Sequence, residues 1–233
     1  MAAHKTIAIT IGGGTSETGK VVDAMLDGVR SAGCQVEHFL LCRPGDCPQD
    51  AASAFDGVAQ DKAAIQNVLA RASAADHLIL GLTGKSGQGN RAFHELRDAC
   101  YEGARWLSLG DVVGNDGDAK TPPEADLHAV AFPAARRALT DAHRALAVYE
   151  PPDEVLDHDD PFCESAFFLV EELQRLLGFL PVGRVLSTGL FRPPLDENPV
   201  LKQQAFELGK RLVTGAISIG GTSIGGTSVG GWK

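Results

Sequence analysis

The chain opens with a run of β-branched and apolar residues, Lys5–Ile11, which has the composition and length of a buried strand. Glycines and small hydroxyl residues follow. From about Ser16 to Ala32 the apolar residues recur at the spacing of one helix face, and Gly33 stands just past the last of them. This pattern predicts a strand, a tight turn and a helix.

Similar alternation continues along the chain. Further strands are expected over 34–41, 76–81, 144–149 and 182–188, and further helices over about 61–73, 91–105, 124–142, 161–178 and 199–213. Loops are expected over 42–54 and 106–123, where glycine, proline and acidic residues break any period. Strands that alternate with helices predict right-handed crossovers and a parallel sheet. We therefore predict an α/β fold, a three-layer sandwich around a five-stranded parallel sheet.

The C-terminal segment differs from the rest of the chain. From Ser218 onward, the motif Ser-Ile-Gly-Gly-Thr and its variants repeat every five residues up to Trp232. Such a composition is typical of a flexible extension, and the alternative is an arm that pairs with a neighbouring subunit. We expect one domain over residues 1–215 and a separate tail over 216–233.

The first turn has the residues of an anion site. Between the strand and the helix lie Gly12–Lys20, with three consecutive glycines and three hydroxyl side chains. Glycines let the backbone approach a ligand closely, and the N–H groups and dipole of a helix N-terminus favour negative charge. The pattern predicts a phosphate-binding turn, and the alternative is a tight turn without a ligand.

A second glycine-rich turn, Leu82–Gly89, follows the strand over 76–81. Ligands of parallel sheets lie beyond the carboxyl ends of the strands, at the point where the strand order reverses. Both turns follow strands at that edge, so we expect them to contribute to one site.

Length, charge and composition narrow the function. The chain has 233 residues, 44% of them hydrophobic, which suits one α/β domain. Its net charge is −9, and an acidic protein has no general attraction to nucleic acid or anionic membranes, so neither is expected as a partner. No apolar run reaches the ~20 residues of a membrane span and no signal peptide is recognisable, so the cytoplasm is the expected location.

The cysteines do not suggest a disulfide framework. They are odd in number and scattered: Cys34, Cys42, Cys47, Cys100 and Cys163. No second close pair completes a four-ligand metal site with Cys42 and Cys47. We expect free thiols, no structural zinc and no iron–sulfur cluster, and we interpret the acidic run 157–160 as a helix start.

These motifs together resemble the flavodoxin-like superfamily, in particular the NAD(P)H-dependent FMN reductases and the related iron–sulfur flavoproteins. The resemblance covers about residues 4–213. It is carried by the segments Thr15–Thr18, Thr18–Val21, Ala75–Leu82, Arg91–Phe93, Leu176–Gly178 and Phe206–Leu212, which match family motifs in order and spacing. The resemblance implies FMN as cofactor, NAD(P)H as co-substrate and a homodimer or homotetramer.

The resemblance also implies where the cofactor binds. The phosphate of FMN would lie on the first turn and the isoalloxazine against residues 83–86. The expected cofactor-binding residues are Gly13, Gly14, Thr15, Ser16, Thr18, Gly19, Lys20, Thr83, Gly84, Lys85 and Ser86. No catalytic side chain is assigned, because a flavin carries the redox chemistry itself.

Three departures from the family pattern keep other functions open. Glu17 stands where the family usually has Asn, and its charge would repel a phosphate unless the side chain turns away. The second turn lacks the family's aromatic residue, and only Cys42 and Cys47 remain where the iron–sulfur branch has its cysteine cluster.

The expected function is therefore an FMN-dependent NAD(P)H oxidoreductase that passes electrons to a small-molecule acceptor. The first alternative is a flavin-free member of the fold that acts as a binding or scaffold protein. The second is a P-loop-type nucleotide-binding enzyme, because Gly14–Lys20 fits the spacing G-x4-G-K. That motif, however, requires Ser or Thr at the position of Val21.

Overall fold

The structure is a computed structural model of the whole chain. It describes residues 4–12, 16–43, 45, 47–49, 51–83, 88–103, 105–107, 129–131, 143–151, 161–187 and 194–215. The predicted tail over 216–233 lies outside these residues, so the predicted division into a domain and a tail stays a prediction. Among the described residues, no helix is long and apolar enough to cross a membrane.

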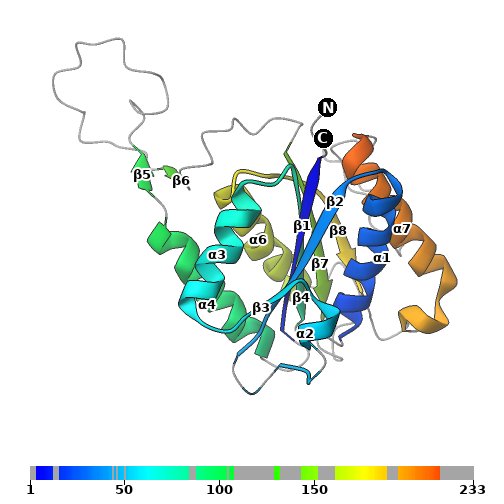
Figure 1. Cartoon of the computed structure of the whole chain (residues 1–233), viewed down its shortest axis with the longest axis horizontal. Coiled ribbons are helices and arrows are strands. Elements are labelled where there is room, and N and C mark those ends of the chain that lie inside the picture. The colour runs from blue at the N-terminus through cyan, green and yellow to red at the C-terminus, as the bar shows by residue number, and fades with distance from the viewer. Residues whose placement is uncertain are drawn as a thin grey trace, which may run out of the picture.

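The main sheet has six parallel strands in the order β3-β2-β1-β4-β7-β8 (Figure 1). They are β1 (Lys5–Ile11), β2 (Gln35–Leu41), β3 (Gly57–Ala59), β4 (His77–Thr83), β7 (Arg144–Glu150) and β8 (Leu180–Leu186). The strand order reverses between β1 and β4. The five long strands correspond to those predicted.

The prediction of only five strands is wrong, because β3 adds a sixth at the edge. This strand pairs with the last part of β2, Phe39 opposite Gly57 and Leu41 opposite Ala59. It has three residues, too few to produce a recognisable period of hydrophobic positions. It follows the four-residue helix α2 (Ala51–Ala54), which occupies part of the expected loop.

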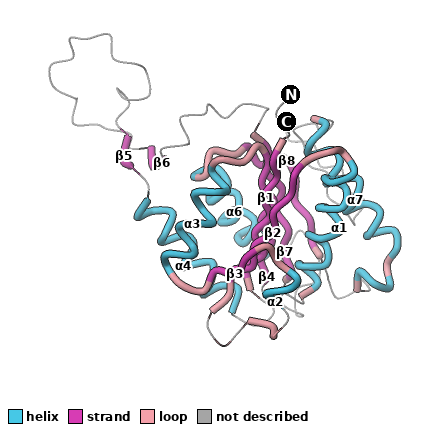
Figure 2. The backbone as a smooth tube through the Cα atoms, viewed as in Figure 1, coloured by secondary structure: helices cyan, strands magenta, loops and turns pink. Residues whose placement is uncertain are grey.

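Helices cover both faces of the sheet, which confirms the three layers. Figure 1 shows α1 (Glu17–Ser31) and α7 (Pro199–Thr214) on one face. On the other face lie α3 (Lys62–Ser73), α4 (Gln88–Gly103) and α6 (Pro161–Leu176). The tube in Figure 2 shows loops at the two ends of the strands, and ligands of such sheets bind at the carboxyl end.

Two hydrophobic clusters fill the space between the layers. Alternate residues of β1 point to opposite faces, so Ile7 and Ile9 join the cluster under α3, α4 and α6, whereas Ala8 joins the one under α1 and α7. Strands β4 and β7 are divided in the same way. Because both faces are covered, these strands are apolar along nearly their whole length.

The helix ends follow the capping signals in the sequence. Asp61 caps α3 by accepting a bond from the N–H of Ala64 at 2.8 Å, and Asn198 caps α7 through the N–H of Leu201 at 3.0 Å. Pro199 then takes the first helical position, as predicted, and Gly215 ends the helix in the left-handed conformation.

One predicted helix is wrong where the structure describes it. Within the expected helix over 124–142, Ala129–Ala131 forms a strand, β6, that pairs antiparallel with β5 (Arg105–Leu107). The Ala-Val-Ala sequence suits either structure, and the cross-strand pairing decides between them. The rest of 108–142 lies outside the described residues.

Helices α1 and α7 pack at backbone contact through two glycines. A Cβ atom on Gly28 would lie 1.9 Å from the carbonyl oxygen of Phe206, and one on Gly209 would lie 2.0 Å from that of Met25. Both helices therefore need glycine at the crossing point. This contact holds the C-terminal helix against the helix that begins at the first turn.

We predict that Gly209→Ala lowers the free energy of unfolding by about 1–3 kcal/mol, because the added methyl group forces the two backbones apart. Alanine normally stabilises a helix relative to glycine, so the sign of the change is diagnostic. Gln204→Ala, at an exposed position of the same helix, is the control and should change stability little. Equal stability of wild type and Gly209→Ala in urea unfolding would contradict the packing.

His77 begins β4 at the amino end of the sheet and is 5% exposed. Burial, which disfavours the imidazolium, is the main reason that the pKa of His77 falls to about 4. The carboxylate of Asp76 opposes this shift, and the nearby charges of His4, Arg144 and His143 add to it. Its Nδ1 has no hydrogen-bond partner among the described residues. The folded protein therefore holds this imidazole neutral.

The stability of the protein should consequently fall as the pH falls. An unfolded histidine binds a proton at about pH 6.5, so between that pH and about pH 4 the unfolded state binds more protons than the folded state. From about pH 7.5 to about pH 5, His77 should account for a loss of about 2 kcal/mol in the free energy of unfolding. His77→Phe should remove this part of the slope, whereas His94→Gln, at an exposed histidine, should retain it. Denaturant unfolding at several pH values measures both, and parallel slopes for wild type and His77→Phe would contradict the assignment.

Candidate functional site

The candidate site lies at the carboxyl ends of β1, β4 and β7, where α1 begins. The N–H of Gly12 donates to the carbonyl of Leu41 at 2.9 Å and so ties the start of the first turn to the end of β2. Of the predicted cofactor-binding residues, Ser16, Thr18, Gly19, Lys20 and Thr83 are described. The others, Gly13, Gly14, Thr15, Gly84, Lys85 and Ser86, lie outside the described residues.

The first turn of α1 lies directly on β4. A Cβ atom on Gly81 would be 2.6 Å from Cγ2 of Thr18 and 3.1 Å from Cγ2 of Val22, so only glycine permits this approach. Thr18 is fully buried in consequence. The strand order reverses between β1 and β4, so this contact places the helix N-terminus at the position where parallel sheets bind ligands.

A buried carboxylate occupies part of this position. Glu150 ends β7 directly beside Thr83 of β4 and is 3% exposed. Its Oε2 accepts hydrogen bonds from the hydroxyl of Thr83 at 2.6 Å and from the backbone N–H of Thr18 at 3.3 Å. The Thr18 hydroxyl lies 3.2 Å from the same oxygen and 3.4 Å from the carbonyl oxygen of Leu82. One acidic side chain thus joins the helix N-terminus to two strands.

The position of Glu150 has an electrostatic reason. The N–H groups of the first helical turn have no intrahelical acceptor, and they carry the positive end of the helix dipole. A carboxylate that accepts from such a group forms a charge-assisted hydrogen bond. At Thr18, Glu150 therefore takes the role that the sequence suggested for a phosphate.

Two other N–H groups of this helix end remain open. The N–H of Gly19 donates to the Ser16 hydroxyl at 3.3 Å, an N-cap bond. The backbone N–H groups of Ser16 and Glu17 have no acceptor among the described residues. An anion bound at this end of α1 would therefore meet these two donors first.

Among the described residues, the carboxylate of Glu17 does not bond to the N–H groups at the start of its own helix, α1. Its Oε2 accepts from the N–H of Leu195, at the start of the short helix η2 (Leu195–Glu197), at 2.8 Å, and its Oε1 lies 2.8 Å from the ammonium of Lys20. The side chain thus joins α1 to the segment before α7. From the sequence, a phosphate was expected beside Glu17 only if this side chain turns away from it. The contacts with Leu195 and Lys20 agree with that condition.

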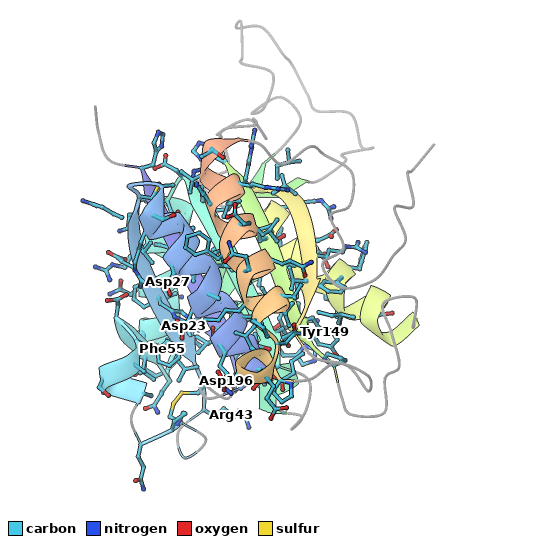
Figure 3. All side chains as sticks on the ribbon, turned by 90° about the vertical axis from the view of Figure 1, so that its right-hand side faces the viewer. Asp23, Asp27, Arg43, Phe55, Tyr149 and Asp196 are labelled. Carbon is cyan, nitrogen blue, oxygen red and sulfur yellow. A yellow bond between two sulfur atoms is a disulfide. The ribbon has the colours of Figure 1, made fainter. Side chains whose placement is uncertain are left out.

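Lys20 has a structural role in the described residues. Its ammonium pairs with the carboxylates of Glu17 and Asp196. Figure 3 shows Asp196 at the lower end of α7. The hydrogen bond to Asp196, followed by that to Glu17, raises the pKa of Lys20, and the same pair lowers the pKa of Asp196. The charge predicted to face a phosphate is therefore already paired, although its role in cofactor binding stays a prediction.

The loop after β2 is closed by a disulfide between Cys42 and Cys47 (Figure 3), so the expectation of free thiols is wrong for this pair. Gly45, with φ of 91°, lets the chain turn back and brings the two Cα atoms to 5.6 Å. Next to it, Arg43 donates from Nε to Glu95 of α4 at 2.9 Å. Cys34 and Cys100 are free and buried, as expected.

A hydroxyl–imidazole–carboxylate chain lies beneath α1 that the sequence did not reveal. Nε2 of His38 lies 2.8 Å from the Thr10 hydroxyl, and Nδ1 lies 3.0 Å from Asp23. This is the arrangement of a nucleophile with its base. Thr10 is fully buried in the central strand, however, so no substrate can reach it and the chain is structural.

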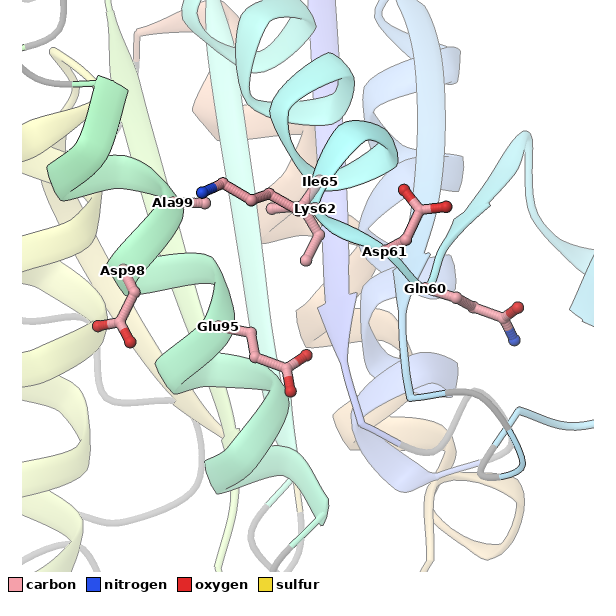
Figure 4. Close-up of a pocket in the computed structure, with 7 residues that line it drawn as sticks. All are labelled: Gln60, Asp61, Lys62, Ile65, Glu95, Asp98 and Ala99. Atoms are coloured by element: carbon pink, nitrogen blue, oxygen red, sulfur yellow. The ribbon is translucent and has the colours of Figure 1, made fainter.

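Figure 4 shows a hollow of about 270 Å³ between α3 and α4. It is lined by Gln60, Asp61, Lys62, Ile65, Glu95, Asp98 and Ala99. None of these residues was predicted to bind a ligand. Three carboxylates line it, which disfavours a phosphate, so we place the candidate site at the helix N-terminus and not here.

Comparisons with solved structures place this architecture among known folds. An FMN-dependent NADH-azoreductase from Bacillus anthracis str. Ames Ancestor, in complex with FMN, matches 90% of this chain and 100% of its own, with TM-score 0.53 and 13% identity. A flavone reductase matches 93% of this chain and 66% of its own, with TM-score 0.58 and 12% identity. The long strands also have the order 2-1-3-4-5. The fold is flavodoxin-like.

No protein-family model and no curated protein matches the chain.

Among the described residues of this flavodoxin-like fold, Glu150 lies at the candidate site although the sequence did not identify it. It follows the apolar residues of β7 and precedes Pro151. An acidic residue at the carboxyl end of a buried strand is a signal that could have found it, because such ends converge on the ligand edge.

We predict that Thr83→Val lowers the free energy of unfolding by about 1.5–3 kcal/mol, because it removes a buried hydrogen bond to a charged acceptor and preserves the shape of the side chain. The matched control is Thr6→Val on β1. Thr6 is also fully buried, and among the described residues its hydroxyl makes no hydrogen bond of normal geometry, only a weak interaction with the thiol of Cys34. Its replacement should be neutral or stabilising. Urea unfolding of both variants is the measurement, and equal effects would show that the Glu150 contact does not stabilise the fold.

Proposed function

We propose that this chain binds FMN at the carboxyl edge of its sheet and acts as an FMN-dependent NAD(P)H oxidoreductase. The observation that carries the proposal is the N-terminus of α1 at the point where the strand order reverses, where the N–H groups of Ser16 and Glu17 have no acceptor in the described ranges. The fold likeness to an azoreductase in complex with FMN supports it. So does the resemblance of the first turn to the phosphate loops of flavoproteins.

The described residues fit an anion at this place. The N–H groups of Ser16 and Glu17 would donate to the phosphate, together with the predicted turn residues Gly13, Gly14 and Thr15. Thr18 would then contribute by orienting the helix end through Glu150 and not by direct contact. The isoalloxazine is expected against residues 83–86.

When bound, FMN would accept a hydride from NAD(P)H and pass electrons to a small acceptor. The chain itself would bind and orient the cofactor. Glu150, Thr18 and Thr83 would hold the ends of β7, α1 and β4 in fixed relation, so that a ligand bound at this edge meets a rigid surface. The nicotinamide, the acceptor, the homo-oligomeric state and the cytoplasmic location stay predictions.

A flavin-free binding or scaffold protein is the second candidate. The observation that favours it is the carboxylate of Glu150, which already binds the N–H of Thr18. A P-loop-type enzyme has less support, because Val21 is fully buried and apolar where a hydroxyl ligand for Mg²⁺ is required. Flavin binding separates the first proposal from both alternatives.

We predict that the purified protein quenches the fluorescence of added FMN and that Glu17→Pro weakens this binding about 10- to 100-fold, because it deletes one N–H donor to a charged oxygen. Proline is well tolerated at the first helical position. Ser16, with φ of −68° and ψ of 160°, already has the extended backbone that the residue before proline requires.

The matched control is Glu17→Ala, which loses the same carboxylate but keeps the N–H. Its FMN affinity should exceed that of Glu17→Pro by the stated factor, and circular dichroism should show both variants folded. Identical affinities would place the phosphate elsewhere. A colourless wild-type protein that neither quenches FMN fluorescence nor oxidises NAD(P)H with a quinone present would favour the flavin-free alternative.

A further inference from the structure

Glu150 stands at the place where the proposed cofactor would bring its phosphate. We propose that Glu150 is a specificity-determining residue that offsets the contribution of the phosphate, so that the site binds riboflavin nearly as tightly as FMN. The inference rests on the proposed flavin function and deepens it. It concerns the ligand of the same site, which would be a flavin whose phosphate adds little to the binding affinity.

The carboxylate is held firmly where it is. It accepts from the Thr83 hydroxyl at 2.6 Å, from the Thr18 hydroxyl at 3.2 Å and from the N–H of Thr18 at 3.3 Å, so a change of rotamer would abandon these donors in a buried place. Its backbone belongs to β7, an interior strand between β4 and β8. The neighbouring Tyr149 pairs with Leu186 of β8, and its carbonyl accepts from the N–H of Ser187 at 2.9 Å.

A phosphate on α1 would lie close to this carboxylate. In the described part of the chain, the N–H groups of Ser16 and Glu17 have no acceptor, and the next N–H along the chain, that of Thr18, is bound to Glu150. Successive N–H groups of one helical turn are only a few ångströms apart. The two anions would therefore share the positive end of one helix dipole and repel each other in a setting of low polarity.

The repulsion can be tested by comparing the affinities of FMN and riboflavin, which have the same ring system. Riboflavin has the isoalloxazine and ribityl chain of FMN but no phosphate, so it does not feel the repulsion. In a phosphate site without a nearby carboxylate, charge-assisted bonds would make FMN much the tighter ligand. With Glu150 present, the two flavins should bind the wild-type protein within about threefold of each other.

The experiment measures dissociation constants of FMN and riboflavin, by fluorescence quenching, for wild type, Glu150→Gln and Glu171→Gln. Glutamine keeps the shape and one acceptor oxygen but removes the charge. Glu150→Gln should bind FMN about tenfold more tightly or better and change riboflavin by less than about threefold. Glu171 is the matched control: it is 8% exposed and paired with Arg175 at 3.1 Å on the opposite face of the sheet. Its variant should retain the wild-type ratio.

A wild-type protein that binds FMN about a hundredfold more tightly than riboflavin would overturn the inference and leave the flavin function intact. An unchanged ratio in a folded Glu150→Gln would do the same. No binding of either flavin by wild type or Glu150→Gln would overturn the flavin function and the inference with it. The wild-type ratio alone decides the matter if Glu150→Gln fails to fold.

Discussion

The contact between the N-terminus of α1 and the ends of β4 and β7 is the constraint on which the candidate site depends. Gly81 lets Thr18 approach the sheet, and Glu150 then satisfies the N–H of that residue. The same helix is held from outside by α7 through Gly28 and Gly209. The start of α1 is therefore fixed from both sides, and a ligand at this edge would meet a pre-organised helix end.

The same contact explains why fewer groups at the site are available to a ligand than the sequence suggested. A helix N-terminus attracts any anion, including one from its own protein. Glu150 binds the donor of Thr18, and Glu17 and Lys20 are engaged with Leu195 and Asp196. Among the described residues of this helix end, the N–H groups of Ser16 and Glu17 remain for a ligand. A flavoprotein of this kind would depend on backbone donors and the ring system more than on side-chain charge.

Most of the fold could be predicted because its strands and helix ends depend on local sequence patterns. The five long strands and the caps at Asn198 and Gly215 follow from hydrophobic period and from the conformations that these residues favour. The short strand Gly57–Ala59 could not be predicted, because its pairing with β2 decides its structure. The strand at Ala129–Ala131 was predicted as helix for the same reason.

The candidate site could be located from sequence, but its chemistry could not. Glycine-rich turns after two strands identify the edge of the sheet. The partner of Thr18, however, is Glu150, which lies 132 positions away in the chain. The hydrophobic periodicity of a sequence carries no information on a contact between residues so far apart in the chain. The disulfide between Cys42 and Cys47 was missed because the sequence does not show that Gly45 turns the chain back.

A crystal structure of the protein soaked with FMN is the most direct measurement of where the anion binds. Density for the phosphate is expected on the N–H groups of Ser16 and Glu17, with Glu150 still bonded to Thr18 and Thr83. A phosphate on the N–H of Thr18, with Glu150 turned out of its place, would contradict this expectation.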